Sequence, residues 1–393
     1  MRDFIPAPRG EWVATRSTTT PPHVEVEWIC QTWLLQSLKE IALGFIVPFQ
    51  EPKSNFSLLR LSPRKSDCLQ RRHIVSAAKQ SRMTPENQTS VREFILVGLS
   101  SHRTTQLLLF FMILLVYSLT LMGNLVIIML VQADPRLQTP MYFFLTHLSV
   151  LEICYTTSTV PQMLAHLLSG NGAISHTRCA IQMYTTMTLG GTECFLLAVM
   201  AYDRFLAICH PLLYTIAMDR SRRWQLASAS WIICCLIAAL NIGCTFQHPY
   251  CGPNHVNHFF CELPLVLKLA CDNTYVTETI VFWTSVVVLL CPLSVVLTSY
   301  GLILSSVLQM GSRAGWRKAF STCASHLAVV SLYYGTLIFM YLKPASANAP
   351  NQDKQIAFFY IVVTPLLNPV IYTLRNKDVH GAVARVMKEN TKL

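Results

Sequence analysis

The sequence has few charged residues for its length. Only 13% of its 393 residues are charged, whereas 52% are hydrophobic, and a soluble domain carries about 25% charged residues. An ordinary soluble globular protein is therefore excluded. The formal net charge is +11, but the basic residues lie between apolar runs rather than together on one solvated face. This distribution argues against a nucleic-acid partner.

The sequence also lacks the short motifs of common catalytic and metal sites. It contains no Gly-x-Ser-x-Gly, no His-Glu-x-x-His and no Walker loop, and Gly170-Asn171-Gly172 lacks the third glycine of a dinucleotide fingerprint. None of the 14 cysteines forms a Cys-x-x-Cys pair, so a zinc or redox site is not expected. We predict that the protein is not an enzyme and has no cofactor, with a bound cation as the one exception considered below.

Long apolar runs are what the sequence has instead. A run of about 20 apolar residues can cross the hydrocarbon as a helix, because a helix bonds its own backbone groups. The sequence contains seven such runs, and we predict an all-α membrane protein, a bundle of seven transmembrane helices. The predicted spans are Leu107–Val131, Met141–Leu168, Cys179–Ile208, Trp224–Cys244, Thr277–Val307, Phe320–Leu342 and Gln355–Leu374.

The basic residues of the connections predict the orientation, because Lys and Arg collect on the cytoplasmic side of a membrane. One alternating set of connections holds most of them: Arg136, Arg220, Arg222, Arg223, Arg313, Arg317, Lys318, Arg375, Lys377, Arg385, Lys388 and Lys392. The opposite set holds only Arg178, Lys268, Lys343 and Lys354. We therefore predict a multi-pass plasma-membrane protein with an extracellular N-terminus and a cytoplasmic C-terminus.

The two ends of the chain differ from the seven-helix region at 107–374. Residues 1–82 mix prolines and charges, show no signal peptide, and are predicted to be a disordered or irregular extension. The segment 83–106 is predicted to be extracellular and glycosylated at Asn87, which begins an Asn-Gln-Thr sequon. In the cytoplasmic tail, 375–393, apolar residues recur every four positions, which predicts a short amphipathic helix on the membrane surface.

Four cysteines lie on the predicted outside, where the compartment is oxidising. They are Cys179, Cys251, Cys261 and Cys271. Four cysteines allow three pairings, and the residues alone leave all three open. The cysteines within or beside the apolar runs fit free buried thiols instead.

Two motifs at the inner ends of spans suggest a conformational switch. Asp203-Arg204 ends the third span, and its guanidinium can change partners when neighbouring helices move. The alternative is an arginine that extends to the lipid headgroups. Asn368-Pro369 precedes Tyr372 in the seventh span, where the proline removes one helix hydrogen bond, and the alternative is an ordinary proline kink. The two motifs at matching depth favour the switch.

Two acidic residues, Glu152 and Glu193, lie at membrane depth. A charge facing lipid costs a few kcal/mol, so we expect both side chains to face the interior and to lie near each other. Two nearby carboxyl groups either share a proton or bind a cation, and both alternatives stay open. A transporter or channel would more often show internal repeats and a line of polar residues, which seven non-repeating spans with two buried acids do not provide.

From about Met83 to its end, the chain resembles the olfactory receptors, a branch of the rhodopsin-like G protein-coupled receptors. Each matching segment falls in its expected span and order. The segments are Gly123-Asn124, Pro140 to Leu145, Met200 to Tyr214, Ser299-Tyr300, Lys318 to Leu327 and Pro365 to Asn376. The chain departs from the family at Glu152, where Asp is usual, at Phe205, where Tyr is commoner, and in the extension 1–82.

The resemblance implies an odorant receptor. Such a receptor binds a small volatile organic ligand in the outer half of the bundle and activates a heterotrimeric stimulatory olfactory G protein, which raises cAMP. Its partners are thus the odorant, the G protein and membrane lipid. The implied ligand-binding residues are Met187, Gly190, Gly191, Tyr334 and Tyr341. Plain helix packing is the alternative explanation for the two glycines.

The resemblance also implies pairings and roles that the residues alone leave open. Cys179 is expected to pair with Cys261, and Cys251 with Cys271, so that the long outside loop forms a lid. In the wider superfamily the region of Glu152 and Glu193 holds sodium, whereas a protonated pair is the alternative here. On activation the inner end of the sixth helix swings outward, and two tyrosines approach Arg204. These are Tyr300 and Tyr372.

Overall fold

The computed structural model describes residues 93–309, 313–341, 350–374, 379 and 381–385. The chain divides into two units, Met1–Arg82 and Met83–Leu393, and all described residues belong to the second. The predicted extension 1–82, the predicted glycosylation site Asn87 and the tail residues 386–393 lie outside the described residues.

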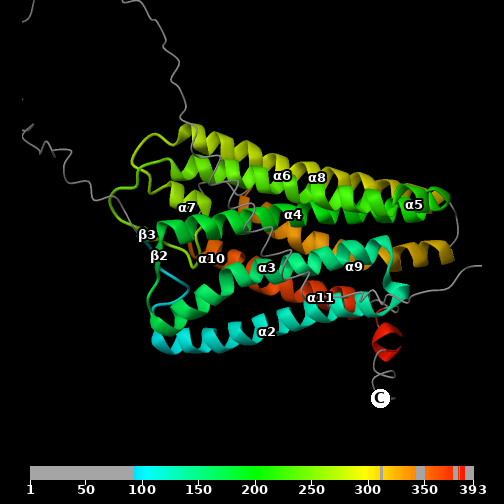
Figure 1. Ribbon diagram of the computed structural model, residues 1–393, viewed down its shortest axis with the longest axis horizontal. Helices are drawn as coiled ribbons and strands as arrows, with labels where there is room; N and C mark the ends of the chain where they lie inside the picture. Colours follow the sequence, from blue (N-terminus) through cyan, green and yellow to red (C-terminus); the bar gives the residue numbers. More distant parts are fainter. Residues whose placement is uncertain (1–92, 310–312, 342–349, 375–378, 380, 386–393) are drawn as a thin grey trace, which may run out of the picture. The chain divides into compact units, whose positions relative to one another are not determined.

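The described chain forms a bundle of six long helices and one interrupted helix (Figure 1). The long helices are α2 (Arg103–Ala133), α3 (Pro140–Ser169), α4 (His176–Cys209), α6 (Arg220–Phe246), α8 (Tyr275–Gln309) and α9 (Arg313–Tyr341). The seventh begins as α10 (Pro350–Phe358), passes through a π-helical turn, η4 (Phe359–Val363), and continues as α11 (Thr364–Leu374). Each helix covers one predicted span, which confirms the predicted seven-helix bundle.

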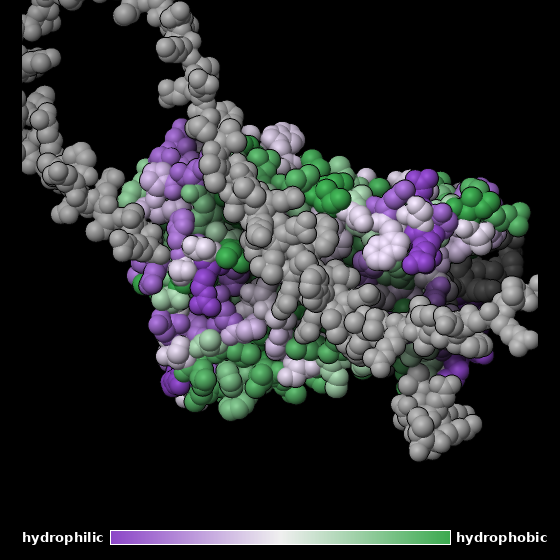
Figure 2. Space-filling view, viewed as in Figure 1, coloured by the Kyte–Doolittle hydropathy of each residue, from purple (hydrophilic) through white to green (hydrophobic). Residues whose placement is uncertain are grey.

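Four described segments are long and apolar enough to cross a membrane by length and composition. They are Arg103–Ala133, Arg220–Phe246, Tyr275–Gln309 and Asp353–Tyr372. Helices α3 and α4 are less hydropathic because they carry several threonines and one buried glutamate each. The outward faces fit lipid tails, since Leu108, Phe111 and Trp283 are all at least 60% exposed. Figure 2 shows hydrophobic residues gathered over α2.

Local signals in the sequence determine several helix ends. The Ser175 hydroxyl accepts a hydrogen bond from the Arg178 amide at 3.3 Å and caps α4. The Asp219 carboxylate caps α6 in the same way, accepting from the Arg222 amide at 2.8 Å. Such side chains satisfy amides that have no partner within the helix. Gly170 ends α3 with a φ of 73°, a left-handed conformation that favours glycine.

A small three-stranded sheet lies at the outer end of the bundle, in the strand order β2-β1-β3. Strand β1 (Glu93–Leu96) pairs antiparallel with β2 (Ala173–Ser175) and parallel with β3 (His255–Val256). Its side chains Phe94 and Leu96 are buried in a hydrophobic cluster. We call β1 to β3, together with the loop 257–262 and the short helix α7 (Leu263–Leu267), the outer lid.

The described part of the tail is held against the first inner turn. Arg385 Nε donates to Asp134 Oδ2 at 2.9 Å, and Arg385 Nη2 contacts the same oxygen. This hydrogen-bonded guanidinium is the main reason why the pKa of Asp134 is lowered. Residues 381–385 are helical, and Val379 and Ala382 are buried, so this stretch packs against the bundle through its apolar side.

Candidate functional site

A buried polar centre joins three helices halfway through the bundle. Glu152 of α3, Glu193 of α4 and Asn368 of α11 are each at most 2% exposed. The Asn368 amide donates to Glu152 Oε1 and lies 3.5 Å from Glu193 Oε1. The structure thus brings the two glutamates together. Among the described residues, neither Glu152 Oε2 nor Asn368 Oδ1 has a hydrogen-bond partner, and these oxygens can accept a proton or a hard cation.

The Gly123-Asn124 motif ties the first helix to the seventh. Asn124 Nδ2 donates to the Pro365 carbonyl at 3.4 Å and to the Thr120 carbonyl at 3.0 Å. A Cβ atom on Gly123 would lie 3.1 Å from Pro369 Cγ, which is a tight contact. The glycine therefore lets α2 approach α11 beside the Asn368-Pro369 motif.

At the inner end of α4, Asp203 and Arg204 are buried, with 2% and 5% of their surface exposed. Tyr214, on the short helix α5 (Pro211–Ala217), donates its hydroxyl to Asp203 Oδ1 at 2.9 Å. This bond links the inner loop that follows α4 to the Asp-Arg pair. The arginine lies within the protein rather than at its surface.

A histidine in α9 connects three helices near Arg204. The ring of His326 is fully buried. Its Nε2 lies 3.1 Å from the Leu197 carbonyl of α4, and its Nδ1 lies 2.7 Å from the Tyr300 hydroxyl of α8. Because a carbonyl can only accept, we assign the proton to Nε2, and Nδ1 then accepts from Tyr300. We did not foresee this bridge, although a histidine at membrane depth signals a buried polar contact.

In the outer half of the bundle, two tyrosines of α9 bond to the backbone of α4. The Tyr333 hydroxyl donates to the Gly190 carbonyl at 2.6 Å, and the Tyr334 hydroxyl donates to the Cys194 carbonyl at 3.1 Å. The structure therefore brings Gly190 and Tyr334 to the same α4–α9 contact. Tyr333 was missing from the predicted set because its position in the sequence gives no hint that it faces Gly190.

The other predicted ligand residues lie in different surroundings. Met187 packs against the hydrophobic cluster of the outer lid. A Cβ atom on Gly191 would lie 3.1 Å from Cys234 Sγ, so Gly191 sits in a close α4–α6 contact. The Tyr341 side chain lies outside the described residues. Their role in ligand binding stays a prediction.

An open groove of about 490 Å³ lies between α9 and the start of the seventh helix. None of the four predicted ligand residues whose side chains are described lines it. Its lining residues are Ser331, Leu332, Gly335, Thr336, Gln355, Ile356 and Phe359.

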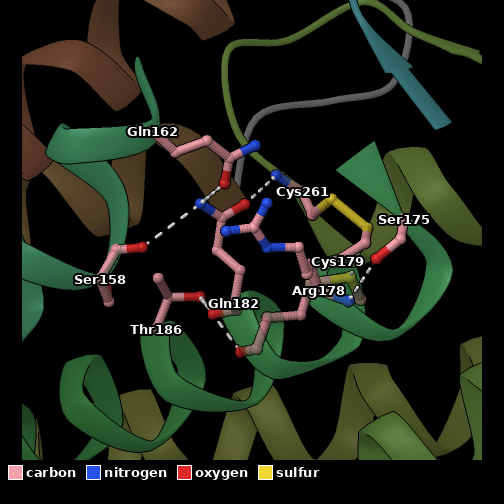
Figure 3. Close-up of a disulfide and its surroundings, with 9 residues drawn as sticks. Ser158, Gln162, Ser175, Arg178, Cys179, Gln182, Thr186 and Cys261 are labelled. Atoms are coloured by element: carbon pink, nitrogen blue, oxygen red, sulfur yellow. Dashed lines mark hydrogen bonds between the residues drawn. A yellow bond between two sulfur atoms is a disulfide. The ribbon is translucent and has the colours of Figure 1, made fainter. Parts of the chain in front are cut away.

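The outer lid is joined to the bundle covalently and by a glutamine. Cys179 is bonded to Cys261 and Cys251 to Cys271, with Cα atoms 5.5 and 5.9 Å apart, and these are the pairings that the resemblance implies. Figure 3 shows Gln182 beside the first disulfide. Gln182 Oε1 accepts from the Cys261 amide at 2.9 Å, and its Nε2 donates to Gln162 Oε1 at 3.0 Å. Gln182 thus connects the lid to both α3 and α4.

Comparison with known proteins identifies the family. The sequence profile described as olfactory receptor matches residues 113–390. Olfactory receptor 11L1 of Homo sapiens is 49% identical over 306 residues, which are 78% of this chain and 95% of that protein. Olfactory receptor-like protein OLF3 of Canis lupus familiaris is 47% identical over 305 residues, which are 78% of this chain and 96% of that protein.

A solved structure supports the same fold. The crystal structure of squid rhodopsin matches with a TM-score of 0.58 at 17% sequence identity, covering 74% of this chain and 87% of that chain. The protein is thus a multi-pass plasma-membrane receptor with the rhodopsin fold rather than an enzyme. With its seven-helix bundle and the disulfides Cys179–Cys261 and Cys251–Cys271, the chain belongs to the olfactory receptor family of G protein-coupled receptors.

Proposed function

We propose that this receptor binds a small, uncharged, volatile organic ligand in the outer half of the bundle and activates a stimulatory olfactory G protein, which raises cAMP. The α4–α9 contact carries the proposal. Helix α9 carries both parts of the link. In the outer half, the uncharged hydroxyl groups of Tyr333 and Tyr334 hydrogen-bond to α4, and in the inner half His326 hydrogen-bonds to α4 and α8. An event in the outer half can therefore change how the inner half is held.

The ligand acts by competing for the hydrogen bonds of the tyrosine hydroxyl groups. Tyr333 and Tyr334 donate to backbone carbonyls of α4, and a ligand carbonyl or hydroxyl that accepts either bond weakens the attachment of α9. A ligand shifts an equilibrium only by binding one state better than the other. Outward movement of the inner end of α9 then requires the bonds of His326 to break, which uncovers the surroundings of Arg204 for the G protein.

The test is a cAMP assay in cells that supply the olfactory stimulatory G protein, with a panel of volatile compounds applied to the full-length chain and to a chain starting at Met83. We expect at least one compound to raise cAMP, and we expect Arg204→Ala to abolish that response at equal surface expression. Arg136→Ala, which replaces an exposed arginine of the first inner turn, is the control and should respond normally. A normal response of Arg204→Ala would contradict the switch.

We further propose that Glu152, Glu193 and Asn368 hold a sodium ion. The observation in favour is that two oxygens of this buried centre have no partner among the described residues, and carboxylate and amide oxygens suit hard cations. The described residues contain no group of three or more His, Cys, Asp or Glu that could hold a metal. Two carboxyl groups with one amide suit a singly charged ion when one carboxyl group keeps its proton, because one positive charge then balances one negative charge. When bound, sodium would supply the positive charge that balances the ionised carboxylate.

Sodium should favour the helix arrangement described above, because its ligands come from α3, α4 and α11. Replacing sodium by choline at constant ionic strength should raise agonist potency by about fivefold, a typical coupling between two sites. Adenylyl cyclase activity in isolated membranes measures this with both faces exposed to the medium. Glu152→Gln should remove the sodium dependence. Equal potency in the two salts for the unmodified receptor would favour a shared proton instead.

A further inference from the structure

A buried histidine without a hydrogen-bond partner lies in the outer lid. His258 is 1% exposed, and neither of its ring nitrogens has a hydrogen-bond partner among the described residues. Its Nε2 lies 3.7 Å from Glu262 Oε2, which is ion-pair range but too long for a hydrogen bond. The rings of Phe259 and Phe260 have their centroids 4.6 and 4.5 Å from the imidazole centroid. The imidazole is thus enclosed by apolar groups, whereas 13% of the Glu262 side chain is exposed.

The pair sits where three segments of the outer end meet. The Gly98 amide, just after β1, donates to the His258 carbonyl at 3.0 Å. Lys354 Nζ of α10 donates to the Gly98 carbonyl at 3.1 Å. Opening the lid at this point would therefore separate the N-terminal strand, the loop and α10 from one another.

Charged and titratable groups from three parts of the structure surround the pair. Asp353 and Lys354 of α10 and Lys268, just after α7, act electrostatically on the pair. His166 of α3 borders Gly98, whose added Cβ atom would lie 2.8 Å from the His166 ring. Burial, assisted by Asp353, raises the pKa of Glu262 to about 7. Burial, assisted by Lys354, lowers the pKa of His258 to about 3.

We propose that His258 and Glu262 form a proton-binding site that fastens the outer lid, so that extracellular acidity sets how often the lid opens. In the closed lid the site holds its proton on the carboxyl group, and the imidazole is neutral. In an opened, solvated lid the carboxyl group ionises and gives its proton to the solvent above pH 6.5, whereas below pH 6.5 the imidazole takes up a proton in its place. Opening thus releases a proton above pH 6.5 and leaves the number of bound protons nearly unchanged just below it.

The direction of the pH effect follows from the two groups separately. The raised pKa of Glu262 means that the closed lid binds its proton more tightly, so closure is favoured as pH falls through 7 towards the ordinary value of 4.5. The lowered pKa of His258 means that the open lid takes up a proton as pH falls below the ordinary value of 6.5. The two effects oppose each other. Between pH 8 and 6.5 the effect of Glu262 is the larger, so the lid closes more firmly as pH falls, and between pH 6.5 and 4.5 the two effects largely cancel.

Hydrogen–deuterium exchange of the purified full-length receptor in lipid nanodiscs tests this without any ligand, so its outcome is independent of the proposed odorant function. The measured quantity is the protection of amides in residues 93–98 and 255–262, corrected for the intrinsic pH dependence of exchange. Protection should increase about twofold from pH 8 to 6.5. In His258→Leu, where the opposing proton uptake is missing, the increase should be about fourfold.

Two further variants separate the site from general effects of pH. Glu262→Gln is neutral at every pH, so only the proton uptake by His258 remains, and protection should fall about twofold from pH 8 to 6.5 instead of rising. Glu93→Gln is the matched control, because Glu93 lies on β1 in the same lid but is exposed, and it should behave like the unmodified receptor. The proposal would be overturned if protection in the unmodified receptor did not depend on pH. It would also be overturned if Glu262→Gln showed the same increase in protection as the unmodified receptor.

Discussion

Replacing Cys179 or Cys261 by serine is expected to remove most of the receptor from the cell surface, and replacing both is expected to remove no more than either alone. The bond joins residues 82 positions apart. In the chain-entropy account, closing a loop of that length contributes at most about 4.5 kcal/mol, a large share of the roughly 5–15 kcal/mol that stabilises a folded protein. Surface antibody labelling per cell, normalised to total receptor, measures the loss.

The other cysteines provide graded controls. Cys251 and Cys271 close a loop of only 20 residues, for which the same account gives about 3 kcal/mol, so their serine variants should lose less surface receptor. Cys291 is a free and exposed thiol, and Cys291→Ser should leave surface expression unchanged. If the losses from Cys179→Ser and Cys261→Ser added together, the two cysteines would act independently, contrary to the bond described here.

His326→Leu is expected to lower the thermal stability of the receptor strongly. The leucine fills a similar space but removes both bonds of the imidazole, which leaves the Leu197 carbonyl and the Tyr300 hydroxyl without this partner. A buried polar group deprived of its bond costs about 1–3 kcal/mol, so we expect a loss of about 2–4 kcal/mol for the two groups together. A thiol-reactive fluorescent dye that reports exposure of the buried cysteines during heating measures the midpoint shift.

A double-mutant cycle shows whether the bridge is the cause. Tyr300→Phe removes one of the two bonds, so His326→Leu combined with Tyr300→Phe should cost less than the sum of the single variants, by about 1 kcal/mol. His147→Leu is the control, because among the described residues His147 hydrogen-bonds only to the Phe143 carbonyl of its own helix, and we expect a distinctly smaller shift. Equal shifts for His147→Leu and His326→Leu would show that the link between helices contributes nothing specific.

The helices could be predicted because hydropathy reports the bilayer directly. The second span, predicted as Met141–Leu168, is Pro140–Ser169 in the structure. The sixth was predicted from Phe320, but α9 begins at Arg313. The first residues of α9 include charged ones, so the helix extends beyond the apolar run. Hydropathy does not report a helical segment that lies outside the hydrocarbon.

The lid sheet could not be predicted, because its signal is not local. Strand β1 has four residues, and its partners Ile174 and Val256 lie far along the chain. Neither partner strand is longer than three residues, which is too short for an alternating pattern to stand out. The loop that follows β3 is instead held by two contacts that are distant in sequence, the Cys179–Cys261 disulfide and the hydrogen bond from the Cys261 amide to Gln182.

The polar centre could be predicted from the sequence, whereas the His326 bridge could not. Glu152 and Glu193 could be expected to converge, because an acid at membrane depth must face inward. The bond from His326 ends on the Leu197 carbonyl, and every residue has a carbonyl. Sequence alone therefore cannot single out the acceptor, even where it shows that one is needed.

The central position of β1 in the lid also dictates an order of assembly during synthesis. Its residues leave the ribosome before any of the seven helices, yet β3 follows about 160 residues later, which takes roughly 10–30 seconds at ordinary translation rates. Although β2 is made about halfway through that interval, the edge of β1 that later pairs with β3 stays unpaired in the lumen of the endoplasmic reticulum, where chaperones can bind it. The outer surface of the receptor is thus completed when β1, which is synthesised before the helices, pairs with β3, which is synthesised after four of them.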